Sequence, residues 1–459
     1  MGGRWGVVNG YKDVLKISLP LVASMASVTV MQFTDRLFLA HYSVEAISAA
    51  LPAGIAAFTF LSLFLGTAGY VNTFVAQYSG AGNRGRVGEA LWQGIYFSIG
   101  SGLLLAFLYF AAPAIFSFVG HSLEVQKLEV VYFRILILGA GLPVLNSAVA
   151  CFYTGRGKTR TVMFVNILGA MVNIPLDYCL INGAAGFPEL GITGAGIATV
   201  VATGVTTALF FVLVFSRANR RDFGIWPPGR FERLLFFRLM RYGLPSGVQF
   251  FLEIFGFTFL IQMLGRLGDL ELAASSIVFS IESLSFLPMV GFHVGTATLV
   301  GQAIGKGRPE EGSFATMSAL HLTMVYMVAV SILFVFAPEL LLNLFKGASR
   351  SAEEFSGVME VGIVLMRFVA LFCLFDAMNL VFSGALKGAG DTSFIMWAIA
   401  VVSMGVMIVP VYLAVEVFGA GLYVAWALAT AYICALGVVL MIRYRQGKWK
   451  TMRVIESRV

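Results

Sequence analysis

Five carboxylates lie inside long apolar stretches of this sequence, where charged side chains are rare. A charge inside an apolar span is costly, by about 3 kcal/mol on insertion scales, and it usually marks the pathway of an ion or a substrate. Burial favours the protonated form of a carboxyl group and a nearby cation favours the ionised form, so a buried acid can exchange a proton for a cation. These acids therefore predict ion-coupled transport. They are Asp35, Asp177, Glu253, Glu282 and Asp376.

The two acids of the first half have polar neighbours at helical spacing. Gln32 precedes Asp35 by one helical turn, and Asn173 shares a helix face with Asp177. Thr199 lies in the next apolar stretch. Carboxylate, amide and hydroxyl groups suit a hydrogen-bonded proton site or the coordination of a hard cation such as Na⁺. The alternative is a polar network that only ties three helices together.

In the second half, Glu253 follows Gln249 by one turn, and Asp376 lies between Phe372 and Asn379. Two carboxylates from different helices that face one cavity would bind Na⁺ or attract an organic cation. An aromatic face nearby would add cation–π contacts. The alternative is that each acid is protonated and bonded to a backbone carbonyl.

The remaining polar residues give weaker signals. Glu282 has Ser285 one turn later, which can satisfy it locally, and we leave open whether this acid serves function or packing. His293 and His321 are isolated, which favours structural roles. The sequence has no glycine-rich phosphate loop followed by Lys-Ser/Thr, and no nucleophile triad. We therefore expect no direct ATP use, no enzymatic catalysis and no cofactor apart from the coupling ion.

The composition identifies the elements that must position these acids. Of 459 residues, 59% are apolar and only 12% are charged, against about 25% charged in an ordinary soluble domain. Twelve apolar stretches, among them 14–40 and 90–119, reach the roughly 20 residues that a membrane-spanning helix needs. They are apolar on all faces, unlike the alternating strands of a membrane barrel. We predict an all-α polytopic membrane protein with twelve transmembrane helices.

The net charge of +7 is unevenly distributed. If the connections alternate between two sides, most of the 31 Lys and Arg fall on the side of both termini. This positive-inside pattern predicts cytoplasmic termini in a multi-pass protein of the cell inner membrane, and it argues against nucleic acid as a partner. The first apolar run is too long for a cleaved signal peptide, so we expect a retained first helix.

An internal repeat relates the two halves. A shift of 225 residues aligns Pro20 with Pro245 and Gln77 with Gln302. Each half has six spans, so the repeats are parallel and are expected to enclose a central cavity. Pro20 and Pro245 precede the acids at equivalent positions and are expected to let these helices bend. The expected division is a first lobe at 1–215, a cytoplasmic linker at 216–238, a second lobe at 239–443 and a cytoplasmic tail at 444–459.

Several motifs give the chain a family resemblance. It resembles the multidrug and toxic compound extrusion (MATE) family, within the multidrug/oligosaccharidyl-lipid/polysaccharide flippase superfamily, along essentially its whole length. The matching segments are Pro20 with Gln32 and Asp35; Gln77-Tyr78-Ser79-Gly80-Ala81-Gly82 and its copy at 302–307; Tyr132-Phe133-Arg134-Ile135; and Asn173-Ile174-Pro175-Leu176-Asp177, continuing through 186–191 to Gly194-Ala195-Gly196-Ile197-Ala198-Thr199.

The resemblance implies export of cationic or amphipathic organic compounds in exchange for Na⁺ or H⁺, by rocking of two lobes. It implies two sets of site residues. Asp35, Asn173, Asp177 and Thr199 match the first-lobe site of DinF-like members, and Glu253 and Asp376 match the second-lobe acids of NorM-like members. The chain carries both sets, so Na⁺ and H⁺ both remain open, and Glu282 matches neither pattern.

Two rival functions have different expectations. A lipid-linked oligosaccharide flippase of the same superfamily would bind an anionic head group and should favour Arg or Lys in the cavity, whereas the candidates here are mostly acidic. Five intramembrane acids argue against a non-transporting scaffold, and uncoupled flux would support a non-coupled channel. We expect a monomer whose partners are small organic cations or amphipathic drugs and the lipid bilayer.

Overall fold

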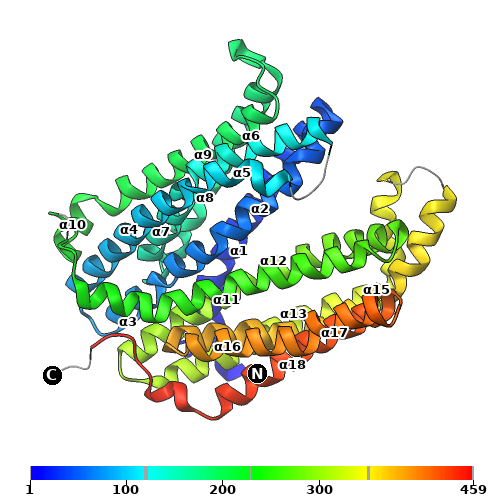
Figure 1. Cartoon of the computed structure of the whole chain (residues 1–459). Coiled ribbons are helices and arrows are strands. Elements are labelled where there is room, and N and C mark those ends of the chain that lie inside the picture. The colour runs from blue at the N-terminus through cyan, green and yellow to red at the C-terminus, as the bar shows by residue number, and fades with distance from the viewer. Residues whose placement is uncertain (1, 118–121, 228, 349–351, 457–459) are drawn as a thin grey trace. The chain divides into compact units, whose positions relative to one another are not determined.

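The computed structural model describes residues 2–117, 122–227, 229–348 and 352–456, and within these ranges it contains helices and no strand (Figure 1). The helices of the first half are η1 (Gly2–Arg4), α1 (Tyr11–Tyr42), α2 (Val44–Gly69), α3 (Val71–Gly80), α4 (Arg84–Ala106), α5 (Leu108–Ser117), α6 (Leu123–Gly139), α7 (Gly141–Thr154), α8 (Thr159–Asn182), η2 (Ala184–Gly186) and α9 (Ile192–Val214). Helix α10 (Arg217–Phe223) lies in the linker. Those of the second half are α11 (Arg233–Gly265), α12 (Asp269–Gly305), α13 (Pro309–Phe336), α14 (Pro338–Leu342), η3 (Asn343–Ala348), α15 (Ala352–Ala389), α16 (Thr392–Val402), η4 (Ser403–Ile408), α17 (Val409–Tyr412), η5 (Leu413–Val417), α18 (Leu422–Arg445) and η6 (Lys448–Thr451).

The long helices confirm the membrane-spanning architecture. In the described ranges, 11 helices are long and apolar enough to cross a membrane, or 12 if the bent pair of α4 and α5 is one span. That pair corresponds to the stretch 90–119 and bends by 46°. At the bend, Phe107 N–H donates to Leu104 O, which is a tighter turn than the α-helix makes. Helices satisfy their own backbone groups, which is why apolar stretches of this length fold in this way inside a bilayer.

The chain forms two compact units that each contain most of one half. Unit 1 comprises the described residues up to Val22, Leu252–Ile304 and Arg308–Arg453, and unit 2 comprises Ala23–Phe251, Gly305–Gly307 and the described chain from Val454. Helix α1 therefore begins in unit 1 and ends in unit 2, whereas α11 begins in unit 2 and ends in unit 1.

Glycines at equivalent positions of the repeat pack against α1 and α11, the two helices that belong partly to each unit. In unit 2, a Cβ atom added to Gly66 of α2 would lie 2.8 Å from the Cα atom of Gly247 in α11. In unit 1, a Cβ atom added to Gly291 of α12 would lie 3.0 Å from the backbone nitrogen of Val22 in α1. The shift of 225 relates both contacts, because it takes residue 66 to 291 and residue 22 to 247. The repeated two-lobe architecture is thus visible in backbone packing.

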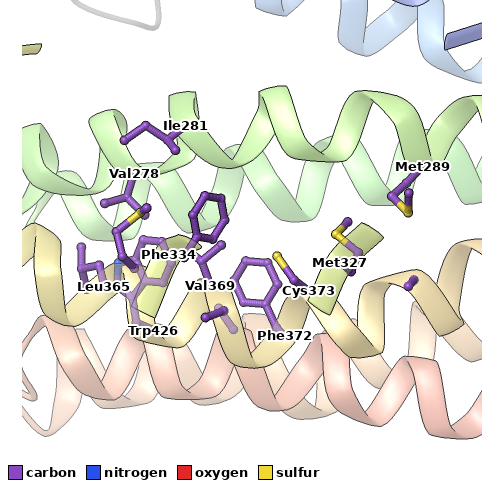
Figure 2. Packing of buried hydrophobic residues seen from close by; sticks show 14 of the residues in the cluster. Val278, Ile281, Met289, Met327, Phe334, Leu365, Val369, Phe372, Cys373 and Trp426 are labelled. Carbon is purple, nitrogen blue, oxygen red and sulfur yellow. The ribbon is translucent and has the colours of Figure 1, made fainter. Parts of the chain in front are cut away.

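Each unit has its own apolar core. In unit 1, α15 packs along α13 and α18, and the core between them includes Phe372 and Cys373 of α15 (Figure 2). Trp426 of α18 is 1% exposed, stacks on Phe279 and donates its indole N–H to Ser275 Oγ at 3.1 Å. In unit 2, α2 packs on α6, and α8 packs on α9. These cores hold the helices that carry the acids.

Candidate functional site

The acids of the first half lie together in unit 2. Asp177 and Asn173 lie one turn apart on α8 and are 0% and 1% exposed. Asp35 of α1 is half-buried, and it is near enough to Asp177 for their charges to interact. The structure therefore brings together the two acids and the amide that the sequence placed in separate segments.

These side chains share one property, which is that their buried polar atoms lack hydrogen-bond partners. Both carboxylate oxygens of Asp177, both amide atoms of Asn173 and Oδ1 of Asp35 are buried, and none has a partner of hydrogen-bonding geometry in the described ranges. Asn173 lies beside Asp177 and interacts with it, but not at that geometry. Buried polar atoms in folded proteins nearly always have a partner. Five such atoms in one place indicate a site for a proton, a water molecule or a cation.

Tyr132 of α6 also belongs to this cluster, and our sequence reasoning did not single it out as a site residue. It is 5% exposed and interacts electrostatically with both Asp35 and Asp177. Gly196 lets α9 approach α6 closely, because a Cβ atom there would lie 3.0 Å from Cγ2 of Ile135 and 3.4 Å from the Tyr132 ring. The sequence signal that could have identified Tyr132 is its place in the motif with Phe133 and Arg134.

The other two first-half candidates lie on α9 and α1. Thr199 is half-buried on α9, one turn after Gly196, and its carbonyl accepts the Thr203 hydroxyl at 2.8 Å. Gln32 is exposed on α1, one turn before Asp35. Helix α1 continues through Pro20, and α11 continues through Pro245, without interruption.

The acids of the second half lie together in unit 1. Asp376 of α15 is 7% exposed, while Glu253 of α11 and Glu282 of α12 are half-buried. The charge of Asp376 interacts with Glu253 and with Glu282, so Asp376 is the common neighbour of the other two acids, and the three acids come from three helices. Asn379 Nδ2 donates to Asp376 Oδ1 at 3.5 Å, the outer limit of a hydrogen bond.

A lysine accompanies these acids, and the sequence reasoning missed it. Lys387 of α15 is half-buried and interacts electrostatically with Glu253. It follows Asp376 by eleven residues, which is about three helical turns and therefore the same helix face. That spacing was the available signal. Tyr432 of α18 also interacts with Glu253 and Asp376.

Two supporting candidates of the second half are buried. Phe372 is 5% exposed and lies in the apolar core of unit 1 (Figure 2). Gln249 of α11 is 2% exposed, and by its position in the chain it belongs to unit 2.

The two isolated histidines connect helices. His293 Nδ1 lies 2.9 Å from Leu380 O, and His321 Nδ1 lies 3.0 Å from the Tyr11 hydroxyl.

The donor sets are suited to a hard monovalent cation rather than a transition metal. Carboxylate, amide and hydroxyl oxygens are the ligands that hard cations prefer. Across the part of the chain that the structure describes, no three His, Cys, Asp or Glu side chains gather as metal ligands. The four cysteines are free thiols, and two of them, Cys151 and Cys373, are buried. The two acid clusters are thus the chemically distinctive places in the molecule.

Two repeated helical units with intramembrane acids define a polytopic membrane transporter. The chain belongs to the MatE family, whose profile matches residues 20–179 and 245–413. Membership in this family makes the chain a transporter rather than an enzyme.

Curated relatives and solved structures agree with this assignment. The chain is 26% identical over 447 residues to the probable multidrug resistance protein NorM of Thermotoga maritima, covering 97% of this chain and 94% of the relative. It is 27% identical over 453 residues to the protein of the same name from Pseudomonas putida, covering 97% and 95%. In fold it is similar to a MOP superfamily transporter from Pyrococcus furiosus, with a TM-score of 0.84 at 20% identity over 96% of this chain and 97% of that one. It is also similar to an outward-facing multidrug resistance MATE family transporter, with a TM-score of 0.85 at 20% identity over 97% and 98%.

Proposed function

We propose that this chain exports cationic or amphipathic organic compounds in exchange for Na⁺ or H⁺, and that the unit 2 cluster is the coupling site. The observation that carries this proposal is the set of five buried atoms on Asp35, Asn173 and Asp177 without hydrogen-bond partners. A proton shared by the two acids, or a cation bound by their oxygens, supplies the missing interaction. We include in this site the hydroxyl groups of Tyr132, which interacts electrostatically with both acids, and of Thr199.

Coupling requires that the cation bind one conformation more tightly than the other. Asp35 lies on α1, whose first part belongs to unit 1 and whose second part belongs to unit 2. A change in the charge of the Asp35–Asp177 pair therefore acts on a helix that runs through both units. Pro20 leaves a carbonyl without its helical partner, so α1 can bend there at lower cost, and Pro245 serves α11 in the same way.

We assign the unit 1 acids to the compound that is carried. Asp376, Glu253 and Glu282 together attract a cationic group, and Lys387 partly neutralises them. Asn379 orients Asp376, and Gln249 supports α11 near Glu253. Phe372 holds the core behind Asp376 and does not act as a primary contact for the compound.

The relatives support export of drugs, because the two NorM proteins carry multidrug resistance in their names. The cation-rich linker and tail support an orientation with both termini in the cytoplasm of a cell with an inner membrane. The proposal includes a monomer, because each of the two units has an apolar core of its own.

The test is transport by the purified protein in proteoliposomes, with a fluorescent organic cation as the probe. A Na⁺ gradient and a pH gradient are imposed separately, and the one that drives dye movement identifies the coupling ion. Glu310→Gln is the control variant, because this acid is 75% exposed and pairs with Lys450 in solvent. If neither gradient drives dye movement and the dye does not bind, the proposed function is wrong.

A further inference from the structure

The turn at 155–159, between α7 and α8, has a counterpart at 388–392, between α15 and α16. A shift of 233 residues aligns the two turns. The third residue of each is a glycine with a positive φ, 73° at Gly157 and 112° at Gly390, a conformation that other residues rarely adopt. The last residue of each is a threonine that begins the next helix. The backbone of the turn is therefore repeated, and its side chains can be compared.

The counterpart in unit 1 contains its own negative charge. Arg443 donates to Asp391 through Nε at 2.7 Å and through Nη2 at 3.2 Å, and the two side chains are 15% and 7% exposed. In unit 2, the residue aligned with Asp391 is Lys158. The residue aligned with the uncharged Ala389 is Arg156. The same turn thus carries an acid in unit 1 and two cations in unit 2.

Arg156 is held between two aromatic rings of unit 2. Its Cζ atom lies 4.4 Å from the ring centroid of Phe152 and 4.1 Å from that of Phe223. The side chain is half-buried, and Nη1 is buried without a hydrogen-bond partner in the described ranges. A guanidinium group has five N–H donors, and buried donors nearly always have an acceptor. Arg156 is therefore fixed in position with a donor that no described group satisfies.

Two further cations lie near Arg156. Its charge interacts with that of Arg84 at the start of α4 and with that of Lys158, and the repulsion from Arg156 lowers the pKa of Lys158. Helix α10 packs on α4 and contributes Asp222, an exposed acid that interacts with both Arg156 and Lys158 (Figure 1). Three cations and one acid leave a net positive charge at this end of unit 2.

The bilayer is the nearest source of an anion for this cluster. The turn joins two candidate membrane spans, so its cations lie where the chain leaves the hydrocarbon core, at the level of lipid head groups. One exposed face of α8 begins with Arg160 and continues with Phe164, Leu168 and Met171, which are 60%, 47% and 64% exposed. These apolar side chains offer a surface for acyl chains directly below the cations.

We propose that Arg84, Arg156 and Lys158 bind the phosphate group of an anionic lipid whose acyl chains lie along the exposed face of α8. The lipid phosphate supplies to unit 2 the negative charge that Asp391 supplies to unit 1. Arginine binds phosphate oxygens through parallel N–H donors, and lysine adds a compact charge. The site needs neither the coupling ion nor the transported compound, so it goes beyond the proposed function.

The proposal is tested by native mass spectrometry of the purified full chain in detergent, titrated with phosphatidylglycerol or with phosphatidylcholine. The unchanged chain should bind phosphatidylglycerol at least tenfold more tightly, because phosphatidylcholine has no net charge. Lys158→Gln replaces an exposed side chain and should weaken phosphatidylglycerol binding about fivefold, which corresponds to about 1 kcal/mol for one cation near an anionic lipid. Arg156→Gln should weaken it at least tenfold.

Arg308→Gln is the control, because it removes an arginine of unit 1 that is 73% exposed and pairs with Glu311. It should keep the affinity of the unchanged chain. The site is overturned if phosphatidylglycerol binds no more tightly than phosphatidylcholine, or if Lys158→Gln keeps the full affinity. Lys158→Gln decides the matter even if Arg156→Gln fails to fold.

Inorganic phosphate distinguishes a lipid site from a site for a free anion. It lacks acyl chains and should bind at least tenfold more weakly than phosphatidylglycerol. Tighter binding of inorganic phosphate than of the lipid would overturn the lipid as the ligand. These measurements use no dye and no ion gradient, so their outcome is independent of the antiport test.

Discussion

The acids of unit 2 and the acids of unit 1 are held by repeated helices but have different surroundings. Asp177 and Asn173 of unit 2 are fully buried, and their polar atoms lack hydrogen-bond partners in the described chain. In unit 1, Asp376 accepts a hydrogen bond from Asn379, and Glu253 has Lys387 as an electrostatic partner. Unit 2 therefore needs something from outside to satisfy its acids, and unit 1 satisfies its acids in part by itself.

The repeat copies the packing of the helices and not the chemistry of the sites. The position equivalent to Asp35 is Leu260, which is 5% exposed in the core of unit 1. The position equivalent to Glu282 is Ala57, which is 6% exposed in the core of unit 2. Each unit thus packs an apolar residue where the other places an acid, and the two sites are free to take different roles.

The largest effect is expected when the coupling ion binds to the acids of unit 2. At about 100 times its dissociation constant, the coupling ion should stabilise the protein by about 2.7 kcal/mol, because it binds the folded state only. Asp177→Asn should remove this ion-dependent rise in Tm, while Glu253→Gln should keep most of it. Thermal unfolding in detergent with the coupling ion varied measures both. If Asp177→Asn keeps the full rise, the contrast between the two units is wrong.

A smaller effect is expected from the lysine in unit 1. Lys387→Met leaves Glu253 without its cationic partner and should destabilise the protein by about 2 kcal/mol. The double variant with Glu253→Gln should recover most of that loss, since both charges are then gone. A double-mutant cycle of unfolding free energies measures the coupling. Additive effects of the two substitutions would show that the pair does not interact.

Sequence alone was sufficient for the architecture but only in part for the sites. The apolar stretches, the repeat and the motifs predicted a two-lobe helical membrane protein, because transmembrane helices follow directly from the length and composition of each segment. The spacing of Asn173 and Asp177 gave their common face for the same reason. The proximity of Asp35 to Asp177 depends on the packing of α1 against other helices, which residue spacing cannot predict. The two acids were paired through the family resemblance.

The residues that were missed belong to tertiary structure. Tyr132 and Lys387 come near the acids because of how α6 and α15 pack against neighbouring helices, and the sequence of one helix does not contain that packing. The exchange of α1 and α11 between the two units was also not predictable, since the residues on either side of Val22 and of Phe251 are apolar and helical alike.

Gly66 and Gly291 test whether the two units share their packing. Alanine at either position places Cβ within 3.0 Å of backbone atoms in the exchanged helix, so each substitution should destabilise by about 1–2 kcal/mol. Gly54→Ala, on the same helix as Gly66, is the control. A Cβ atom there has nothing within 4 Å, so alanine should be neutral or stabilising by less than about 1 kcal/mol. Unequal losses at Gly66 and Gly291 would show that the packing is not shared.

The smallest effect is expected at Glu456, whose carboxylate accepts hydrogen bonds from the Tyr78 hydroxyl and from Arg238. Its pKa lies below the ordinary value of 4.5, so its contribution is complete above pH 4.5 and is lost as the pH falls through the lowered pKa. Because the pair with Arg238 is partly exposed, the contribution should be below about 1 kcal/mol. Two residues before Glu456, the Val454 N–H donates to Gln77 Oε1 at 3.0 Å, and its hydrogen-exchange protection factor should stay constant from pH 8 to about pH 5. A loss of protection near pH 7 would contradict the lowered pKa of Glu456.

The most direct test of the central claim compares the two units in one transport assay. Gradient-driven dye movement is measured for Asp177→Asn and Glu253→Gln in the same proteoliposomes, with dye binding measured in parallel. We predict that Asp177→Asn binds dye but loses gradient-driven transport about 100-fold, because the cation no longer has its site. We predict that Glu253→Gln weakens dye binding and keeps the dependence of transport on the gradient. Unchanged gradient-driven transport by Asp177→Asn would contradict the assignment of coupling to unit 2.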